Sequence, residues 1–118
     1  VASNMAVTPE AIVVASIPGK YPLTYRLEQN YPNPFNGSTT IQYEIPDNRT
    51  TESKTAIQIF NVLGQKVKTL VSAPHDPGQY KVTWNGTDDN GAHVASGIYL
   101  YRLITKTHLT TKKMIYVK

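Results

Sequence analysis

The sequence has 118 residues, of which 40% are hydrophobic and 17% are charged, and its net charge is +4. This length fits one domain, and the composition is too apolar for a disordered chain. No apolar run approaches the roughly 20 residues that a membrane helix needs, so we expect no stable membrane insertion. Cysteine is absent, which excludes disulfides, thiolate metal sites and cysteine nucleophiles.

The positive charge lies in the C-terminal half of the chain. Residues 1–53 carry a net charge of −2, whereas residues 54–118 carry +6. A basic half can attract nucleic acid, anionic lipid headgroups or an acidic partner. Nucleic-acid interfaces typically combine clustered arginines with stacking aromatics, but this half contains one arginine, Arg102. We therefore expect no nucleic-acid binding and interpret the lysines as residues that protect sheet edges.

Residues 1–24 differ from the rest of the chain. Residues 11–17 are typical of either a strand or an extended linker, and Pro18-Gly19 breaks any regular element that precedes it. We interpret residues 1–24 as a linker or junction to an upstream domain, and residues 25–118 as the folded domain.

A proline-rich stretch, residues 30–36, opens this domain, and we call it the entry segment. Pro32 and Pro34 fix their own φ angles and disfavour helical geometry in the residues before them. Asn36-Gly37 then supplies a turn, and an alternating strand begins directly behind it. We expect a stiff entry, clamped by Tyr31 and Phe35, into a compact β-domain.

Short strands separated by Gly, Pro and Asn turns follow, with no helical period. The clearest strand places Tyr80, Val82 and Trp84 on one face and polar residues on the other. A bend at Asn61–Gly64, with Gly64 at positive φ, predicts a hairpin. The predicted strands span residues 40–45, 56–60, 66–71, 80–84, 98–104 and 109–117. The run 98–104 is apolar on both faces apart from Arg102, which indicates a central strand with the last strand beside it. The pattern predicts an all-β antiparallel sandwich of about seven strands.

The candidate catalytic and metal-binding residues are sparse. His75, His93 and His108 fall in or beside separate predicted loops, so a zinc site would have to draw on three loops, and we expect surface histidines. The acidic loop Asn85–Gly91 lacks the register of an EF-hand and is better explained by tight turns, although calcium binding stays open. No serine has a neighbouring base pattern or a Gly-x-Ser-x-Gly elbow. We expect neither enzyme activity nor a cofactor.

The aromatic residues allow two interpretations. Trp84 with Tyr80, Tyr99 and Tyr101 would suit a sugar-stacking platform of a carbohydrate-binding module. Alternation, however, places Trp84 on the same face as Val82, and such a residue usually belongs to the core. We predict a core position for Trp84.

Several blocks of the sequence together resemble a known family. The blocks read LEQNYPNPFN at 27–36, IFNVLGQKV at 59–67, GQYKVTWNG at 78–86, VASGIYLYRL at 94–103 and TKKMI at 111–115. In order and spacing they are similar to the type A C-terminal sorting domain of type IX (Por) secretion substrates, over residues 27–118. Two departures are Gly37, where many relatives have proline, and Asn85, where aspartate is usual.

The resemblance implies a fold and a function. Such domains are seven-stranded Ig-like sandwiches of Greek-key type on large secreted proteins of the Bacteroidetes and their relatives. They act as non-catalytic secretion signals that direct an attached N-terminal cargo from the periplasm through the outer-membrane translocon to the cell surface or the extracellular space. A surface sortase commonly cleaves them off and attaches the cargo to anionic lipopolysaccharide. The cut would lie within or before residues 1–24.

The resemblance also suggests a recognition surface for the translocon and the sortase. It would combine the entry segment, the start of the central strand and the lysines of the last strand. The residues are Asn33, Pro34, Phe35, Asn36, Gly97, Tyr99, Lys112, Lys113 and Lys118. The alternative function is an Ig-like binding or scaffold module that contacts polysaccharide or a neighbouring domain. In its favour, the half from Trp84 to Tyr99 also resembles the Ig-like domain of flagellar hook-capping proteins.

Overall fold

The computed structural model describes residues 12–15, 24–46 and 54–118. The described residues form eight β-strands, and none of their segments is a helix able to cross a membrane. The strands are β1 (Ile12–Ala15), β2 (Arg26–Leu27), β3 (Thr39–Ile45), β4 (Lys54–Asn61), β5 (Lys66–Pro74), β6 (Gly78–Trp84), β7 (Gly97–Ile104) and β8 (Leu109–Tyr116). Seven of them, β2 to β8, lie within the predicted domain.

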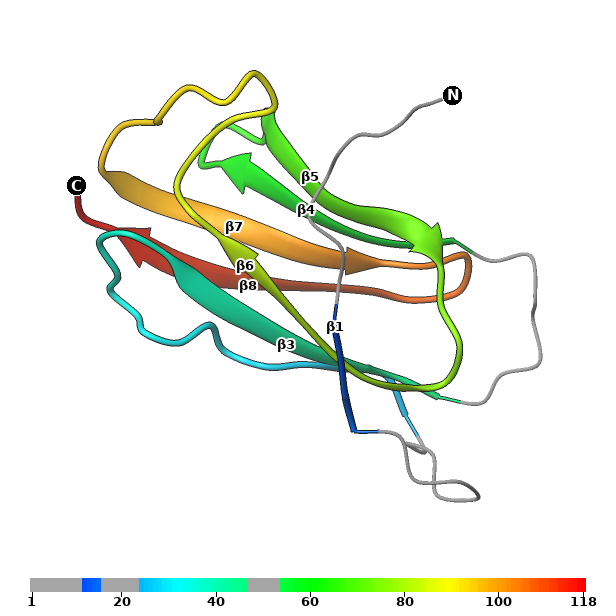
Figure 1. Ribbon diagram of the computed structural model, residues 1–118. Coiled ribbons are helices and arrows are strands. Elements are labelled where there is room, and N and C mark those ends of the chain that lie inside the picture. The colour runs from blue at the N-terminus through cyan, green and yellow to red at the C-terminus, as the bar shows by residue number, and fades with distance from the viewer. Residues whose placement is uncertain (1–11, 16–23, 47–53) are drawn as a thin grey trace, which may run out of the picture.

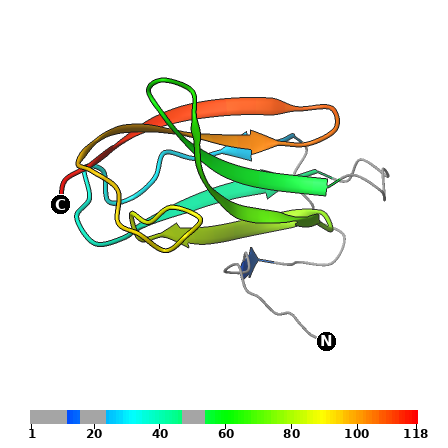
Figure 2. The same ribbon diagram turned by 90° about the horizontal axis from the view of Figure 1, so that it is seen from above.

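The strands form two four-stranded sheets packed face to face (Figures 1 and 2). The first sheet has the order β1-β6-β3-β2 and the second has the order β5-β4-β7-β8, and every pairing is antiparallel. The chain changes sheet between β3 and β4, between β5 and β6, and between β6 and β7, as in a Greek-key sandwich. The predicted all-β sandwich is confirmed.

Alternation of side chains builds the inner face of the first sheet. In β3 the residues at 41, 43 and 45 are buried, while Gln42 between them is exposed. β6 follows the same pattern, and Ile41 lies opposite Val82 in the β3–β6 register. Because successive side chains of a strand point to opposite faces, one register fixes both the core and the outer polar face.

The second sheet confirms the predicted hairpin and the predicted central strand. β4 and β5 pair around a turn in which Gly64 has φ 83°, a left-handed conformation that favours glycine. β7 lies between β4 and β8, and β8 is an edge strand. On the outer face the guanidinium carbon of Arg102 lies 4.5 Å from the centroid of the Phe60 ring, a cation–π contact.

β1 falls within the predicted linker. Its backbone pairs with the edge of β6, with Ile12 opposite Lys81. The prediction of an extended linker or strand at residues 11–17 is therefore met by a strand at 12–15. Apart from β1 and Thr24, residues 1–24 lie outside the described residues, and the junction and the cleavage position remain predictions.

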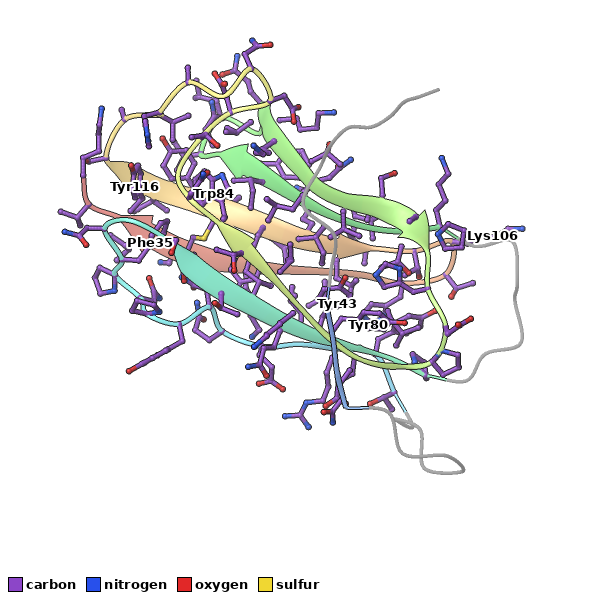
Figure 3. All side chains as sticks on the ribbon, in the orientation of Figure 1. Phe35, Tyr43, Tyr80, Trp84, Lys106 and Tyr116 are labelled. Carbon is purple, nitrogen blue, oxygen red and sulfur yellow. The ribbon has the colours of Figure 1, made fainter. Side chains whose placement is uncertain are left out.

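Aromatic residues occupy both ends of the core (Figure 3). Phe35, Trp84 and Tyr116 gather at the end near the C-terminus, and Tyr43 and Tyr80 stack on each other at the opposite end. Trp84 is fully buried, and its indole N–H donates to the carbonyl of Thr87 at 2.8 Å. The predicted core position of Trp84 is confirmed, so this ring is unavailable as a platform for sugar.

Candidate functional site

The entry segment lies along the outer edge of β8, and we call this contact the seam. The backbone N–H of Phe35 donates to the carbonyl of Ile115 at 3.0 Å, and the N–H of Val117 donates to the carbonyl of Phe35 at 2.8 Å. Phe35 and Tyr116 form a parallel bridge across the seam. Segments about 80 positions apart in the sequence thus pair as neighbouring strands do, and the entry segment covers part of the β8 edge.

Two polar side chains extend the seam. The Oδ1 atom of Asn33 accepts the backbone N–H of Ile115 at 2.9 Å. One residue before the entry segment, the Nε2 atom of Gln29 donates to the carbonyl of Lys113 at 2.8 Å. These bonds satisfy outward-facing backbone groups that an edge strand otherwise leaves to water or to another chain.

The seam rests on a buried aromatic cluster. Phe35 is 2% exposed; its ring stacks on Tyr116 with 4.9 Å between centroids and meets Trp84 edge-on at 5.7 Å. Tyr99 packs edge-on against Trp84 at 5.3 Å, and its hydroxyl donates to the carbonyl of Ala95 at 2.6 Å. Phe35 and Tyr99, two of the predicted recognition residues, therefore shape the seam from below and present little surface of their own.

A buried polar network holds the start of the entry segment. The side-chain amide of Asn30, which is 2% exposed, donates to the Thr39 hydroxyl at 2.9 Å, and that hydroxyl donates to the carbonyl of Pro32 at 2.8 Å. The Tyr101 hydroxyl accepts the backbone N–H of Asn30 at 2.8 Å and donates to the carbonyl of Glu28 at 2.7 Å. Sequence reasoning missed this network, because no local pattern links residues so far apart in the chain.

Burial raises the pKa of the Tyr101 phenol to about 12. The hydrogen bond from Asn30 opposes this shift, and the nearby Glu28 charge adds to it, but desolvation is the largest cause. Tyr101 is therefore neutral at physiological pH, and its hydroxyl can both donate and accept, as the network requires.

The predicted lysines do not form one cluster. Lys112 and Lys113 are successive residues of β8, so they point to opposite faces of its sheet, with Lys113 on the exposed outer face. Lys118 follows the strand, and its backbone N–H donates to the Ser96 hydroxyl at 2.8 Å. Gly97 lies opposite Tyr116 in the β7–β8 register. The fold thus brings the entry segment and Gly97 close to the C-terminal end of β8. The lysines, in contrast, do not share one face of the sheet.

The exposed remainder of the entry segment comprises Tyr31 to Pro34 and Asn36. Its peptide bonds before Pro32 and Pro34 are both cis. Asn33, Pro34 and Asn36, together with Lys113 and Lys118, give the seam a polar and basic surface. The predicted recognition residues include no carboxylate.

The histidines correct one expectation. His93 is exposed, but His75 and His108 are half-buried because they pack on aromatic rings. The His75 ring lies 4.3 Å from Tyr80 between centroids, and its Nε2 atom is 2.7 Å from the Tyr43 hydroxyl. His108 stacks on Tyr25 at 4.5 Å. Within the described residues, no three His, Asp or Glu side chains gather as a metal site would require.

The acidic loop at residues 85–91 uses its carboxylates internally. The Oδ1 atom of Asp88 accepts the backbone N–H groups of Asn90 and Ala92 at 2.9 and 3.0 Å. The Oδ1 atom of Asp89 accepts the N–H of Thr69 on β5 at 3.0 Å. The Asp88 bonds are local turn contacts of the kind that the sequence predicts, whereas the Asp89 bond fastens the loop to β5.

Two antiparallel sheets packed face to face and joined by Greek-key crossings define an immunoglobulin-like module. A comparison with known families agrees: the model of the FlgD Ig-like domain matches residues 33–108, more than half of the 118-residue chain. The chain belongs to this family. The match includes the strands from β3 to β7, whereas β2 and β8 lie outside it. No curated protein and no solved structure matches the chain.

Proposed function

We propose that this Ig-like module is a sorting domain that carries an attached cargo through a type IX secretion system. The observation that carries the proposal is the ordered series of sequence blocks from Leu27 to Ile115, which extends on both sides of the FlgD-type match. In this proposal residues 25–118 are a non-catalytic signal, and its partners are the translocon, the sortase and the cargo before it. The route runs from the periplasm to the cell surface.

The architecture supports such a role on physical grounds. A passenger signal has to fold on its own and present a defined surface, and it needs no cleft for chemistry. The seam meets the second need, because backbone hydrogen bonds hold its exposed residues and the aromatic cluster lies beneath them. Pro34 and Asn36 flank the buried Phe35, so its packing fixes where they are displayed.

A reporter fusion tests the proposal. A periplasmic reporter is joined to the N-terminus of the full chain and expressed in a bacterium with a type IX system and in an isogenic strain without the translocon. Release to the surface or the medium is expected in the first strain, and retention in the periplasm in the second. Retention in both strains would favour the alternative, a scaffold or binding module, which the FlgD family match accommodates equally well.

The recognition surface has its own test in the same assay. Deleting residues 110–118 would be uninformative, because β8 contributes the buried Met114 and Tyr116 to the core. Substituting glutamine at Lys112, Lys113 and Lys118 keeps the strand, and we expect a lower extracellular fraction of reporter.

A matched triple variant carries glutamine at Lys54, Lys66 and Lys106, which are exposed. Lys54 and Lys66 lie on β4 and β5, away from the β8 edge, and Lys106 lies at the opposite end of the molecule (Figure 3). This variant removes the same charge and is expected to be exported like the parent. Equal export of the two triple variants would show that the lysines of the last strand only protect the edge of the sheet.

A further inference from the structure

A polar hollow lies on the outer face of the first sheet, on the side away from the core. Its volume is about 410 Å³, within the range of roughly 300–1,000 Å³ typical of small-molecule sites. Its lining residues come from the chain after β2, from β3 and from β6. They are Glu28, Gln29, Tyr31, Thr40, Gln42 and Lys81.

The sheet register determines why these side chains meet. Thr40 and Gln42 alternate with the buried residues of β3, so they project outward, and Lys81 lies directly opposite Gln42 on β6. Tyr31 is tied to Thr40 by two backbone hydrogen bonds, of 3.0 and 2.9 Å. The hollow is therefore built on a rigid sheet with a fixed aromatic residue beside it.

Most of the polar groups in the hollow have no protein partner. In the described part of the chain, the side chains of Tyr31, Gln42 and Lys81 make no hydrogen bond or ion pair. Tyr31 is 81% exposed, the most exposed of the large hydrophobic side chains in the described residues. Glu28 is oriented by Arg26, whose Nε atom lies 2.9 Å from its carboxylate. The hollow thus presents an open ring, a free amide, an ammonium group and an oriented carboxylate.

The chemical groups that line the hollow indicate which class of ligand could bind there. Glu28 and Lys81 contribute one charge of each sign, which favours neither an anion nor a cation. The lining offers no continuous apolar wall for a lipid tail or an apolar peptide side chain. A pyranose ring fits the set, because its polarised C–H groups meet the negative face of an aromatic ring. Its hydroxyls can exchange hydrogen bonds with amide, carboxylate and ammonium groups.

A second, smaller hollow extends the first along the sheet. Its volume is about 120 Å³, and it shares Glu28 and Gln42 with the larger one. Beyond them it reaches Glu44 and Gln79, whose side chains are joined by a 3.2 Å hydrogen bond. We propose that the outer face of the β2-β3-β6 sheet binds a neutral oligosaccharide, with one sugar stacked on Tyr31 and the next over Gln42. This site lies on the outer face of the first sheet, next to the seam but outside the residues predicted for recognition, and Gln29 borders both.

The test is an NMR titration of the full chain with neutral hexasaccharides of glucose, mannose, xylose and N-acetylglucosamine, each raised to about 10 mM to reach the weak range of specific affinity. At least one is expected to shift amide signals of residues 28–31, 40–42 and 81. Tyr31→Ala should weaken that binding about tenfold, equivalent to about 1.4 kcal/mol. Leu63→Ala, which truncates a similarly exposed side chain on the β4–β5 turn, should leave it unchanged.

The absence of shifts with all four sugars would overturn the proposal, as would unchanged binding by the Tyr31→Ala protein. Thermal melting of both variants verifies that they are folded, which is expected because both side chains lie at the surface. Export of a reporter fused to Tyr31→Ala separates the two roles. Normal export with weakened sugar binding supports a distinct glycan site, whereas impaired export with intact sugar binding would assign Tyr31 to sorting instead and reject the site.

Discussion

Gly86 illustrates how a single residue sets the fit at the aromatic end of the core. It has φ +77°, and a Cβ atom placed there would lie 2.5 Å from the Cζ atom of Tyr116. Real Cβ atoms essentially never approach a neighbour this closely. The missing side chain therefore makes room for the tyrosine that pairs with Phe35 across the seam.

Gly86→Ala is expected to destabilise the domain more than Gly91→Ala. Both substitutions force a left-handed conformation on alanine, at about 1–2 kcal/mol each. Gly91 has φ +85° and no atom within 4 Å of its added Cβ, so it lacks the second cost of overpacking, about 1–3 kcal/mol. Urea denaturation of both variants measures the difference. Equal losses of stability would show that Tyr116 does not press on this position.

Tyr101→Phe tests the buried network at the start of the entry segment. The substitution leaves the buried N–H of Asn30 and the carbonyl of Glu28 without the hydroxyl that joins them. Leaving such groups unsatisfied costs about 1–3 kcal/mol. Tyr31→Phe removes a hydroxyl from an exposed ring and should change the free energy of unfolding by less than about 0.5 kcal/mol. Similar values for the two variants would argue against the network.

For single residues, the sequence predicts which side chains are buried better than it predicts which residues they contact. Alternation placed Trp84 in the core correctly, because a period of two is a local property. The burial of His75 and His108 against tyrosines was not predicted, nor was the contact of Asn30 with Thr39. These contacts depend on how loops return to the sheets, and that information is not local.

The element that links fold and proposed function is the edge of β8. The residues at 111, 113 and 115 direct their backbone groups away from β7, since alternate residues of an antiparallel pair face outward. Among the described residues, Gln29 covers the carbonyl of Lys113, and Asn33 and Phe35 cover the C-terminal part of this edge. The outward backbone groups of β8 are thus hydrogen-bonded at the seam, and those nearer the start of the strand are exposed.

Amide hydrogen exchange is expected to report this division of the strand. The amides of Ile115 and Val117 should be protected, because they donate to Asn33 and Phe35. The outward amides of Thr111 and Lys113 should exchange quickly. In Asn33→Ala, protection of Ile115 should fall while that of Val117 persists. Uniform protection along β8 would show that the edge is covered throughout.

The positions of the strands along the chain could be predicted from the sequence, whereas the way in which they pair in space was predicted less completely. Six predicted strands correspond to β3 through β8, and the hairpin around Gly64 was correctly located. The parallel pairing of Phe35 with Tyr116 was not predictable from periodicity, since it joins the two ends of the domain. The proposal that both ends share a recognition surface came from the family resemblance, and the seam supplies its geometry.

At the scale of the whole molecule, the buried tyrosines make stability sensitive to alkaline pH. Burial raises the pKa of Tyr101 to about 12 and also raises the pKa values of Tyr43, Tyr80 and Tyr99. The folded state therefore holds these protons more tightly than the unfolded chain does. Their contribution to stability is complete below the unfolded pKa of 10 and is lost as the pH rises toward the folded values.

Chemical denaturation between pH 7 and pH 12 tests this linkage. The part of the free energy of unfolding that depends on tyrosine should stay constant to about pH 9 and fall above about pH 10. The fall should be less steep in Tyr101→Phe, which removes one of the shifted groups. A stability that rises above pH 10, or an equal slope in the variant, would contradict the burial of these phenols.

The sorting role is tested by fusing a reporter to the full chain in a cell with a type IX system. The measurement is how much of the reporter stays in the periplasm and how much reaches the outside. The proposed sorting role predicts that most of the reporter reaches the surface or the medium in that cell and stays in the periplasm of the strain without the translocon. Equal periplasmic retention in the two strains would contradict the sorting role and leave an Ig-like module of the FlgD family with a binding or scaffold function.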